Sequence, residues 1–291
     1  MEKELMQIQQ GTYAEDIISP REAMLLAEQW HIKLPENSVT SSHRNLNKDE
    51  WNRHIDEDFS DFDIVRHCVL NCLAGYRVED QERNKAGMLY INVLKLPYES
   101  MFERANIVIV RDTLIEWNMN TRGAKLEKED RFIELIQNVK PIFDQLNQYT
   151  LLDFINESKC KEIEKLLCEL YRTLKISINN PFVTTSKTLH FYMPQLFIPI
   201  DRTYTVNYFT NYRGADLPNK ENKKDLVKWA ISFHKLLAQL YYRFEEDFNE
   251  LSTQTKIPVT KLLDDVLIGF AIYRRSYCAK FDPHKYIKIL T

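Results

Sequence analysis

The chain has 291 residues, 44% of them hydrophobic and 12% aromatic, so it can bury a substantial core and is too apolar for an intrinsically disordered protein. Its 6 glycines fall far below the usual fraction of about 7%, and they form neither a Walker phosphate loop nor a dinucleotide-binding fingerprint. The formal net charge of −3 provides no overall attraction to nucleic-acid phosphates, so a DNA-binding role would depend on local basic groups.

The sequence predicts a cytoplasmic protein without a membrane span. No stretch reaches the roughly eighteen uncharged apolar residues that a span requires, and the first residues, MEKELMQIQQ, lack the apolar core of a secretory signal. The 5 cysteines, an odd number, are typical of free thiols in a reducing compartment. His67, Cys68 and Cys72 superficially suggest a metal, but they lie in an apolar segment, so we expect buried thiols and no metal site.

Apolar residues recur with the period of a helix along most of the chain, which predicts a mainly α-helical protein. We expect residues 1–60 to form a short N-terminal extension and linker, with a helix over 19–30 and a loop over 35–47, and residues 61–291 to form a helical domain. The predicted helices of that domain cover residues 62–76, 98–117, 158–174, 225–251 and 258–275. Within the second of these, the β-branched residues of 106–110 are also compatible with a strand.

Residues 181–209 place one lysine and one aspartate where each can start a short helix. Residues of the types that cap helix N-termini stand at 184–186, so Lys187 is expected in the first turn of a helix that a proline ends. The apolar run 196–200 is long enough to lead the chain back to Asp201, the expected N-cap of the next helix. Both side chains are therefore expected at the same end of a helix pair.

A lysine beside a carboxylate can carry out nucleophilic chemistry on a sugar. The amine attacks only when it is neutral, and partial burial or the positive end of a helix favours the neutral form. The carboxylate can act as a general base or stabilise positive charge on the sugar, and a Schiff base is the covalent route open to lysine. Lys187 and Asp201 are thus candidate catalytic residues, although an aspartate before a helix is most often only a cap.

The order of hairpin-like turn, lysine, helix, apolar-Pro-apolar-Asp element and helix resembles the 8-oxoguanine DNA glycosylase branch of the helix-hairpin-helix glycosylases. In that family the lysine attacks the sugar C1′ of a flipped nucleotide and the aspartate assists departure of the base; Lys187 and Asp201 are the matching positions. Two further segments, 117–126 and 261–267, resemble a bacterial group of glycosylase-like proteins. The resemblance covers roughly residues 105–277 and implies a two-lobed helical fold in a bacterial or phage-related setting, including phage defence.

The resemblance also implies a pocket for a flipped base and contacts to DNA phosphates. A flipped base requires aromatic or apolar walls and a few polar groups that read its edge. The residues available for that pocket are His190, Tyr192, Tyr204, Trp117 and Asn120, although for His190 the sequence favours a packed core histidine. The residues available for phosphate contacts are Thr184, Thr185, Ser186, Lys175 and Arg202.

The function that the resemblance implies is that of a DNA glycosylase excising a damaged or modified base, with strand cleavage at the abasic site left open. It implies DNA as the partner and neither a metal nor an organic cofactor. The alternative is a non-catalytic helical module that binds nucleic acid or protein, favoured by the net negative charge and by the absence of glycine from 179–185, where the family carries a glycine-rich turn. A third hypothesis is an enzyme acting on RNA or a nucleoside. The sequence leaves the base and the oligomeric state open.

Overall fold

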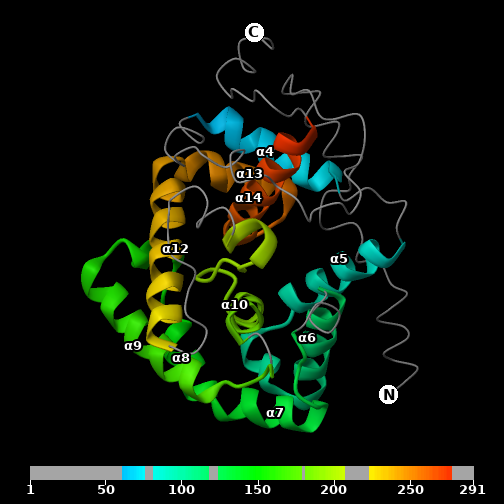
Figure 1. The fold of residues 1–291 in the computed structure, drawn as a ribbon, viewed down its shortest axis with the longest axis vertical. Coiled ribbons are helices and arrows are strands. Elements are labelled where there is room, and N and C mark those ends of the chain that lie inside the picture. The colour runs from blue at the N-terminus through cyan, green and yellow to red at the C-terminus, as the bar shows by residue number, and fades with distance from the viewer. Residues whose placement is uncertain (1–60, 76–80, 118–123, 179–180, 207–222, 277–291) are drawn as a thin grey trace.

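The computed structural model describes residues 61–75, 81–117, 124–178, 181–206 and 223–276 (Figure 1). The N-terminal extension expected over 1–60 lies outside these ranges. Within them the chain is helical, with no strand and one isolated bridge between Leu126 and Ser177, which confirms the mainly α-helical prediction. No helix in this described part combines the length and the apolar character that a membrane crossing needs.

The described part of the chain consists of helical elements joined by non-helical segments. In chain order they are α4 (Phe62–Gly75), α5 (Gln81–Leu94), η3 (Tyr98–Phe102), α6 (Arg104–Glu116), α7 (Glu129–Asn138), α8 (Lys140–Leu146), η4 (Leu151–Phe154), α9 (Glu157–Thr173), α10 (Pro181–Tyr192), η5 (Arg202–Val206), α12 (Lys223–Arg243), α13 (Glu245–Thr255) and α14 (Val259–Ser276). Helices α4, α9 and α14 confirm three predictions to within one or two residues. The long helix predicted over 225–251 is instead divided at Phe244 into α12 and α13.

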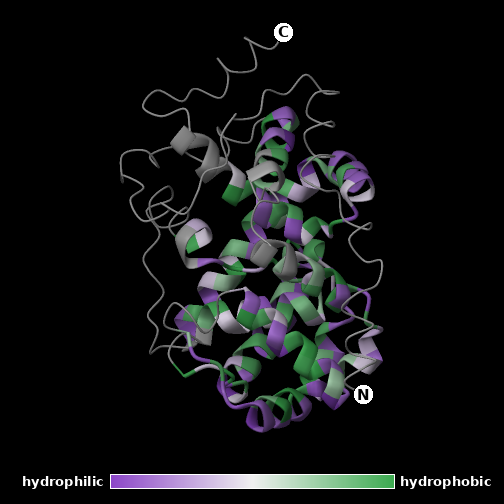
Figure 2. Cartoon of the chain, turned by 90° about the vertical axis from the view of Figure 1, so that its right-hand side faces the viewer, coloured by the Kyte–Doolittle hydropathy of each residue, from purple (hydrophilic) through white to green (hydrophobic). Residues whose placement is uncertain are grey.

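The strand considered for residues 106–110 is not formed, because this segment lies inside α6. Ile107, Val110 and Leu114 are fully buried on one face of α6, a spacing of three and four residues that suits a helix and not a strand. Tertiary packing therefore overrides the β-branched composition here. Figure 2 shows hydrophobic and hydrophilic residues on the same helices, as expected where each helix covers part of a shared core.

Helix α10 lies at the centre of the molecule (Figure 1). Around it, α4, α13 and α14 gather at one end, α9 and α12 along one side, and α5 and α6 along the other (Figure 1). Every residue from 182 to 192 is buried, although six of these eleven positions carry Thr, Ser, Lys or His. A helix enclosed on all sides is normally apolar, so the polar residues of α10 must find their partners inside the protein.

Helices α4 and α14 pack together in close contact, and Gly269 makes their approach possible. A Cβ atom at Gly269 would lie 1.6 Å from the carbonyl oxygen of Cys68 and 2.5 Å from its carbonyl carbon. The backbone of α4 therefore occupies the space that any side chain at this position would need. The close approach also brings Cys72, one turn further along α4, to Asp265 on α14, where the thiol donates to the carboxylate at 3.4 Å.

Candidate active site between α10 and α14

The helix that carries Lys187 begins before the residues predicted to cap it. It begins at Pro181, a residue type that suits the first helical position because its missing N–H would have had no partner there. Residues 184–186 consequently lie inside the helix, and Lys187 lies in its second turn. The predicted N-cap at 184–186 is wrong because the helix starts three residues earlier. Ser186 caps nothing: its hydroxyl donates within the helix, to the carbonyl oxygen of Val183 at 3.2 Å.

The chain then returns along the path that the sequence predicts. After a turn at 194–196, the extended residues 197–200 run back beside α10. The backbone N–H of Ile200 donates to Ser186 Oγ at 2.9 Å, so the residues next to Lys187 and Asp201 are joined directly. A second anchor comes from α12, where His234 Nε2 accepts from the N–H of Ile198 at 3.0 Å.

Asp201 caps the short turn that follows it, as predicted. Its Oδ1 accepts from the backbone N–H of Tyr204 at 3.2 Å, and its own N–H donates to Thr205 Oγ1 at 3.0 Å. The turn is a single π-helical one, since the N–H of Val206 bonds the carbonyl of Asp201 five residues earlier at 3.0 Å. These bonds orient the carboxylate while leaving its second oxygen directed at Lys187.

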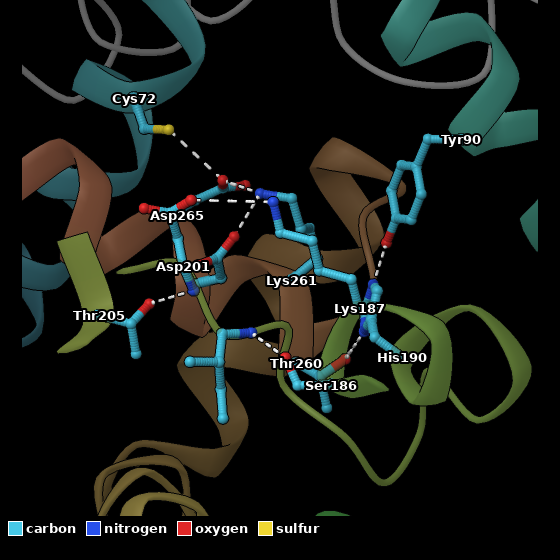
Figure 3. Close-up of polar contacts among 12 residues, drawn as sticks. Cys72, Tyr90, Ser186, Lys187, His190, Asp201, Thr205, Thr260, Lys261 and Asp265 are labelled. Carbon is cyan, nitrogen blue, oxygen red and sulfur yellow. Dashed lines mark hydrogen bonds and ion pairs between the residues drawn. The ribbon is translucent and has the colours of Figure 1, made fainter. Parts of the chain in front are cut away.

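The two predicted catalytic side chains meet. Lys187 Nζ lies 3.8 Å from Asp201 Oδ2, within the roughly 6 Å expected of a catalytic pair. The lysine side chain is 10% exposed and the aspartate 31%, so the amine lies in the interior and the carboxylate nearer the surface. Trp117 covers the amine, whose nitrogen lies 5.5 Å from the centre of the indole ring. Figure 3 shows the pair among the polar residues that surround it.

Helix α14 adds a second lysine and two more carboxylates, which the sequence did not single out as site residues. The Lys261 amine bonds Asp264 Oδ2 at 3.0 Å and also Asp265 Oδ1 (Figure 3). All three side chains are largely buried, and burial raises the pKa of Asp264 to about 6. Burial, together with the charge of Asp265, raises the pKa of Cys72 well above its ordinary value, so this thiol stays protonated.

The spacing of these α14 residues was visible in the sequence. A lysine followed by carboxylates three and four positions later places all three on one helix face. That pattern usually marks an exposed, solvated ion pair, and nothing local distinguishes a buried one. Only the packing of α14 against α4 and against η5, the turn that follows Asp201, shows that Lys261, Asp264 and Asp265 face the Lys187 pair.

His190 lies one turn beyond Lys187 in a neutral, fully bonded network. Its Nδ1 lies 2.7 Å from the carbonyl oxygen of Phe197, which can only accept, so Nδ1 carries the proton and Nε2 accepts from the Tyr90 hydroxyl at 2.7 Å. Burial lowers the pKa of His190 to about 3. This is the packed core histidine that the sequence offered as an alternative, and it does not line a base pocket.

The other predicted pocket residues are placed as follows. Tyr192 is a correction, because it is buried between Phe102 and Phe143 with ring centres 5.2 and 5.0 Å away, and so belongs to the core. Trp117 and Tyr204 are partly buried; Trp117 contacts the Lys187 amine and Tyr204 packs near Cys72. Asn120 lies outside the described residues.

The residues predicted to contact DNA phosphates also differ in their exposure. Thr184, Thr185 and Ser186 are almost completely buried, so their hydroxyls do not face a DNA backbone, which corrects that prediction. Lys175 is exposed beside the start of α10 and remains available. The side chain of Arg202 lies outside the described residues.

Neither a metal site nor a known relative assigns a role to these residues. In the described ranges no group of three or more His, Cys, Asp or Glu side chains could hold a metal ion. Cys68 and Cys72 are buried free thiols, as predicted. Compared with known proteins, the chain matches no family model, no curated protein and no solved structure.

Proposed function

We propose that this protein is a DNA glycosylase that excises a damaged or modified base through Lys187 as nucleophile and Asp201 as its acidic partner. The fold would be the two-lobed helix-hairpin-helix type that the sequence resemblance implies. The observation that supports the proposal is the 3.8 Å distance between the amine and the carboxylate. The two residues belong to separate elements, and local geometry alone does not force them together.

The chemistry follows from this geometry. The neutral amine attacks C1′ of the nucleotide, a C–N bond forms to lysine, and the base leaves with the electron pair of the glycosidic bond and takes up a proton. Asp201 accepts a proton from the lysine or stabilises the positive charge that develops on the sugar. Opening of the sugar ring then leaves an iminium between C1′ and Lys187. Burial of the amine under Trp117 protects this intermediate from water.

The alternative is a helical binding module without catalysis. Two observations favour it: the net charge of −3, and the burial of Thr184, Thr185 and Ser186, which removes the hydroxyls expected to hold phosphates. In such a protein the Lys187–Asp201 pair would serve only to fasten the returning segment to α10.

Borohydride trapping tests the proposal. The protein is incubated with duplexes that carry abasic sites or a panel of modified bases, and borohydride is added to reduce an iminium to a stable secondary amine. We expect a covalent protein–DNA adduct whose modified peptide contains Lys187. Lys187→Ala should abolish the adduct, because it removes the amine that lies 3.8 Å from Asp201, whereas the Lys261 amine is held by Asp264 and Asp265.

Lys159→Ala is the matched control. Lys159 also pairs with an aspartate, Asp153, at 2.6 Å, but on an exposed part of α9. Its loss should leave trapping unchanged. Trapping that survives Lys187→Ala would refute the nucleophile, and DNA binding without trapping or base release would establish the binding module.

A further inference from the structure

Two lysines and three carboxylates share one largely buried site. Lys187 comes from α10, Asp201 from the returning segment, and Lys261, Asp264 and Asp265 from α14. Figure 3 shows the ends of both lysine side chains directed into the same group of carboxylates. With all five groups charged, the site carries one more negative than positive charge, so the acids outnumber the amines that can pair with them.

The carboxylates are divided unequally between the two lysines. Lys261 Nζ forms hydrogen-bonded ion pairs with both acids of α14, at 3.0 Å to Asp264 and closer still to Asp265. Lys187 Nζ has Asp201 at 3.8 Å, which is an ion-pair distance but too long for a hydrogen bond. Lys261 is therefore held by two hydrogen-bonded acids, whereas Lys187 forms a longer ion pair with a single acid.

The acidic pair of α14 is not fully compensated by Lys261. Asp264 Oδ1 is buried without a hydrogen-bond partner, so one oxygen of the pair could accept another donor. Burial raises the pKa of Asp264 most, Lys261 lowers it, and the charges of Asp265 and Asp201 raise it again, as expected of acids that crowd one another. The pair consequently attracts any additional cation within reach, and the Lys187 ammonium is the neighbouring one.

We propose that Lys261 is a positioning residue for this site: by occupying Asp264 and Asp265 it keeps that pair from capturing the Lys187 ammonium, and so leaves Lys187 available as a nucleophile. A lysine bound by two buried carboxylates would be locked in its charged form, since close opposite charges favour the ammonium. The inference rests on the proposed role of Lys187. Other titratable groups around the pair are Cys72 on α4, Tyr90 on α5 and His190 on α10, all held neutral by burial at pH 7.

Reductive methylation of lysines tests this inference without DNA. Formaldehyde with a mild borane reagent modifies neutral amines, and peptide mass spectrometry gives the rate at Lys187 relative to Lys161, an exposed lysine of α9. In Lys261→Met we expect the relative rate at Lys187 to fall by about tenfold at pH 8, because the freed acids pair with Lys187. Lys261→Arg should keep the wild-type rate.

The triple variant Lys261→Met, Asp264→Asn, Asp265→Asn separates this role from a structural one. Without these two acids neither can pair with the Lys187 ammonium. The methylation rate at Lys187 should therefore return to within about twofold of the wild-type rate. This variant also avoids the unpaired buried acids that could unfold the single mutant. Lys140→Met is the matched control, because Lys140 of α8 likewise lies between two acids, Asp144 of the same helix and Glu99 of η3.

The outcomes are distinct. An unchanged Lys187 rate in Lys261→Met, or an equal loss in the single and triple variants, overturns the inference. Borohydride trapping on abasic DNA is measured on the same proteins. If Lys187 is methylated as expected in every variant but never forms a DNA adduct, the proposed glycosylase activity is refuted and the positioning role of Lys261 stands.

Discussion

Two buried polar networks lie along α10, and they differ in charge. Around His190 every group is neutral, and both ring nitrogens have partners at 2.7 Å. Around Lys187 the groups are charged, the nearest carboxylate is 3.8 Å away, and Asp264 keeps an oxygen without a hydrogen bond. Fully satisfied buried networks rigidify a fold, whereas partly satisfied charged ones are costly to bury. The contrast indicates that the first network holds this region together, and the second is where the proposed chemistry would take place.

The two networks meet at Trp117 and depend on different packing. The indole ring lies 5.1 Å from Tyr90 and 6.4 Å from His190, while the Lys187 amine lies 5.5 Å from the ring on the charged side. The charged network also reaches α4 through Cys72, whereas the His190 contacts come from α5, the returning segment and α14. Variants can therefore perturb one network and spare the other.

Gly269→Ala should have the largest effect, since it separates α4 from α14. A methyl group 1.6 Å from a backbone carbonyl cannot be accommodated by a side-chain rotation, so the helices must move apart. We expect the free energy of unfolding to fall by about 4 kcal/mol, above the usual range for overpacking, measured by urea denaturation. Gly87→Ala is the control, because its Cβ would meet nothing within 4 Å and should stabilise α5 by up to about 1 kcal/mol. Equal effects of the two changes would contradict this account.

His190→Ala tests the neutral network. We expect a loss of about 3 kcal/mol at pH 7, because the change removes a buried ring and leaves the Tyr90 hydroxyl and the Phe197 carbonyl without their partner. The folded pKa of about 3 lies below the ordinary value of 6.5, so the contribution of His190 is present above pH 6.5 and is lost as the pH falls toward 3. The difference from wild type should shrink across that window in urea titrations.

Asp264→Asn tests the charged network and should show the opposite pH dependence. The folded pKa of Asp264 is raised from 3.8 to about 6, so its favourable contribution is present below pH 3.8 and is lost as the pH rises through 6. The stability of wild type relative to Asp264→Asn should therefore fall by on the order of 2 kcal/mol between pH 4 and pH 6. A difference that is flat across this range would show that Asp264 titrates normally.

Trp117→Leu should have the smallest effect and should touch both networks. We expect a loss of about 1 kcal/mol in the free energy of unfolding, from aromatic contacts and the cation–π contact with Lys187. Methylation at Lys187 should become about twofold faster, because the ring no longer covers the amine. Slower methylation would mean that Trp117 positions the lysine and does not merely shield it.

Much of the secondary structure was predictable because its signals are local. The apolar stripes of α4, α9 and α14 specify a helix whatever surrounds them. The strand considered as an alternative for 106–110 and the N-cap predicted at 184–186 are both absent, for a common reason. Both were inferred from local residue preferences, and these were outweighed by the burial of one face of α6 and of residues 184–186 inside α10.

The sequence by itself determined the helical class, the buried thiols, and the reach of the chain from Lys187 back to Asp201, because each depends on residues close together along the chain. Tertiary structure alone decided that Lys261, Asp264 and Asp265 join this pair. The contact that places Asp265 beside Cys72 spans 193 positions, and it exists because Gly269 lets two helices approach each other's backbone. A local pattern specifies which face of a helix carries its charges, and only long-range packing determines what that face meets.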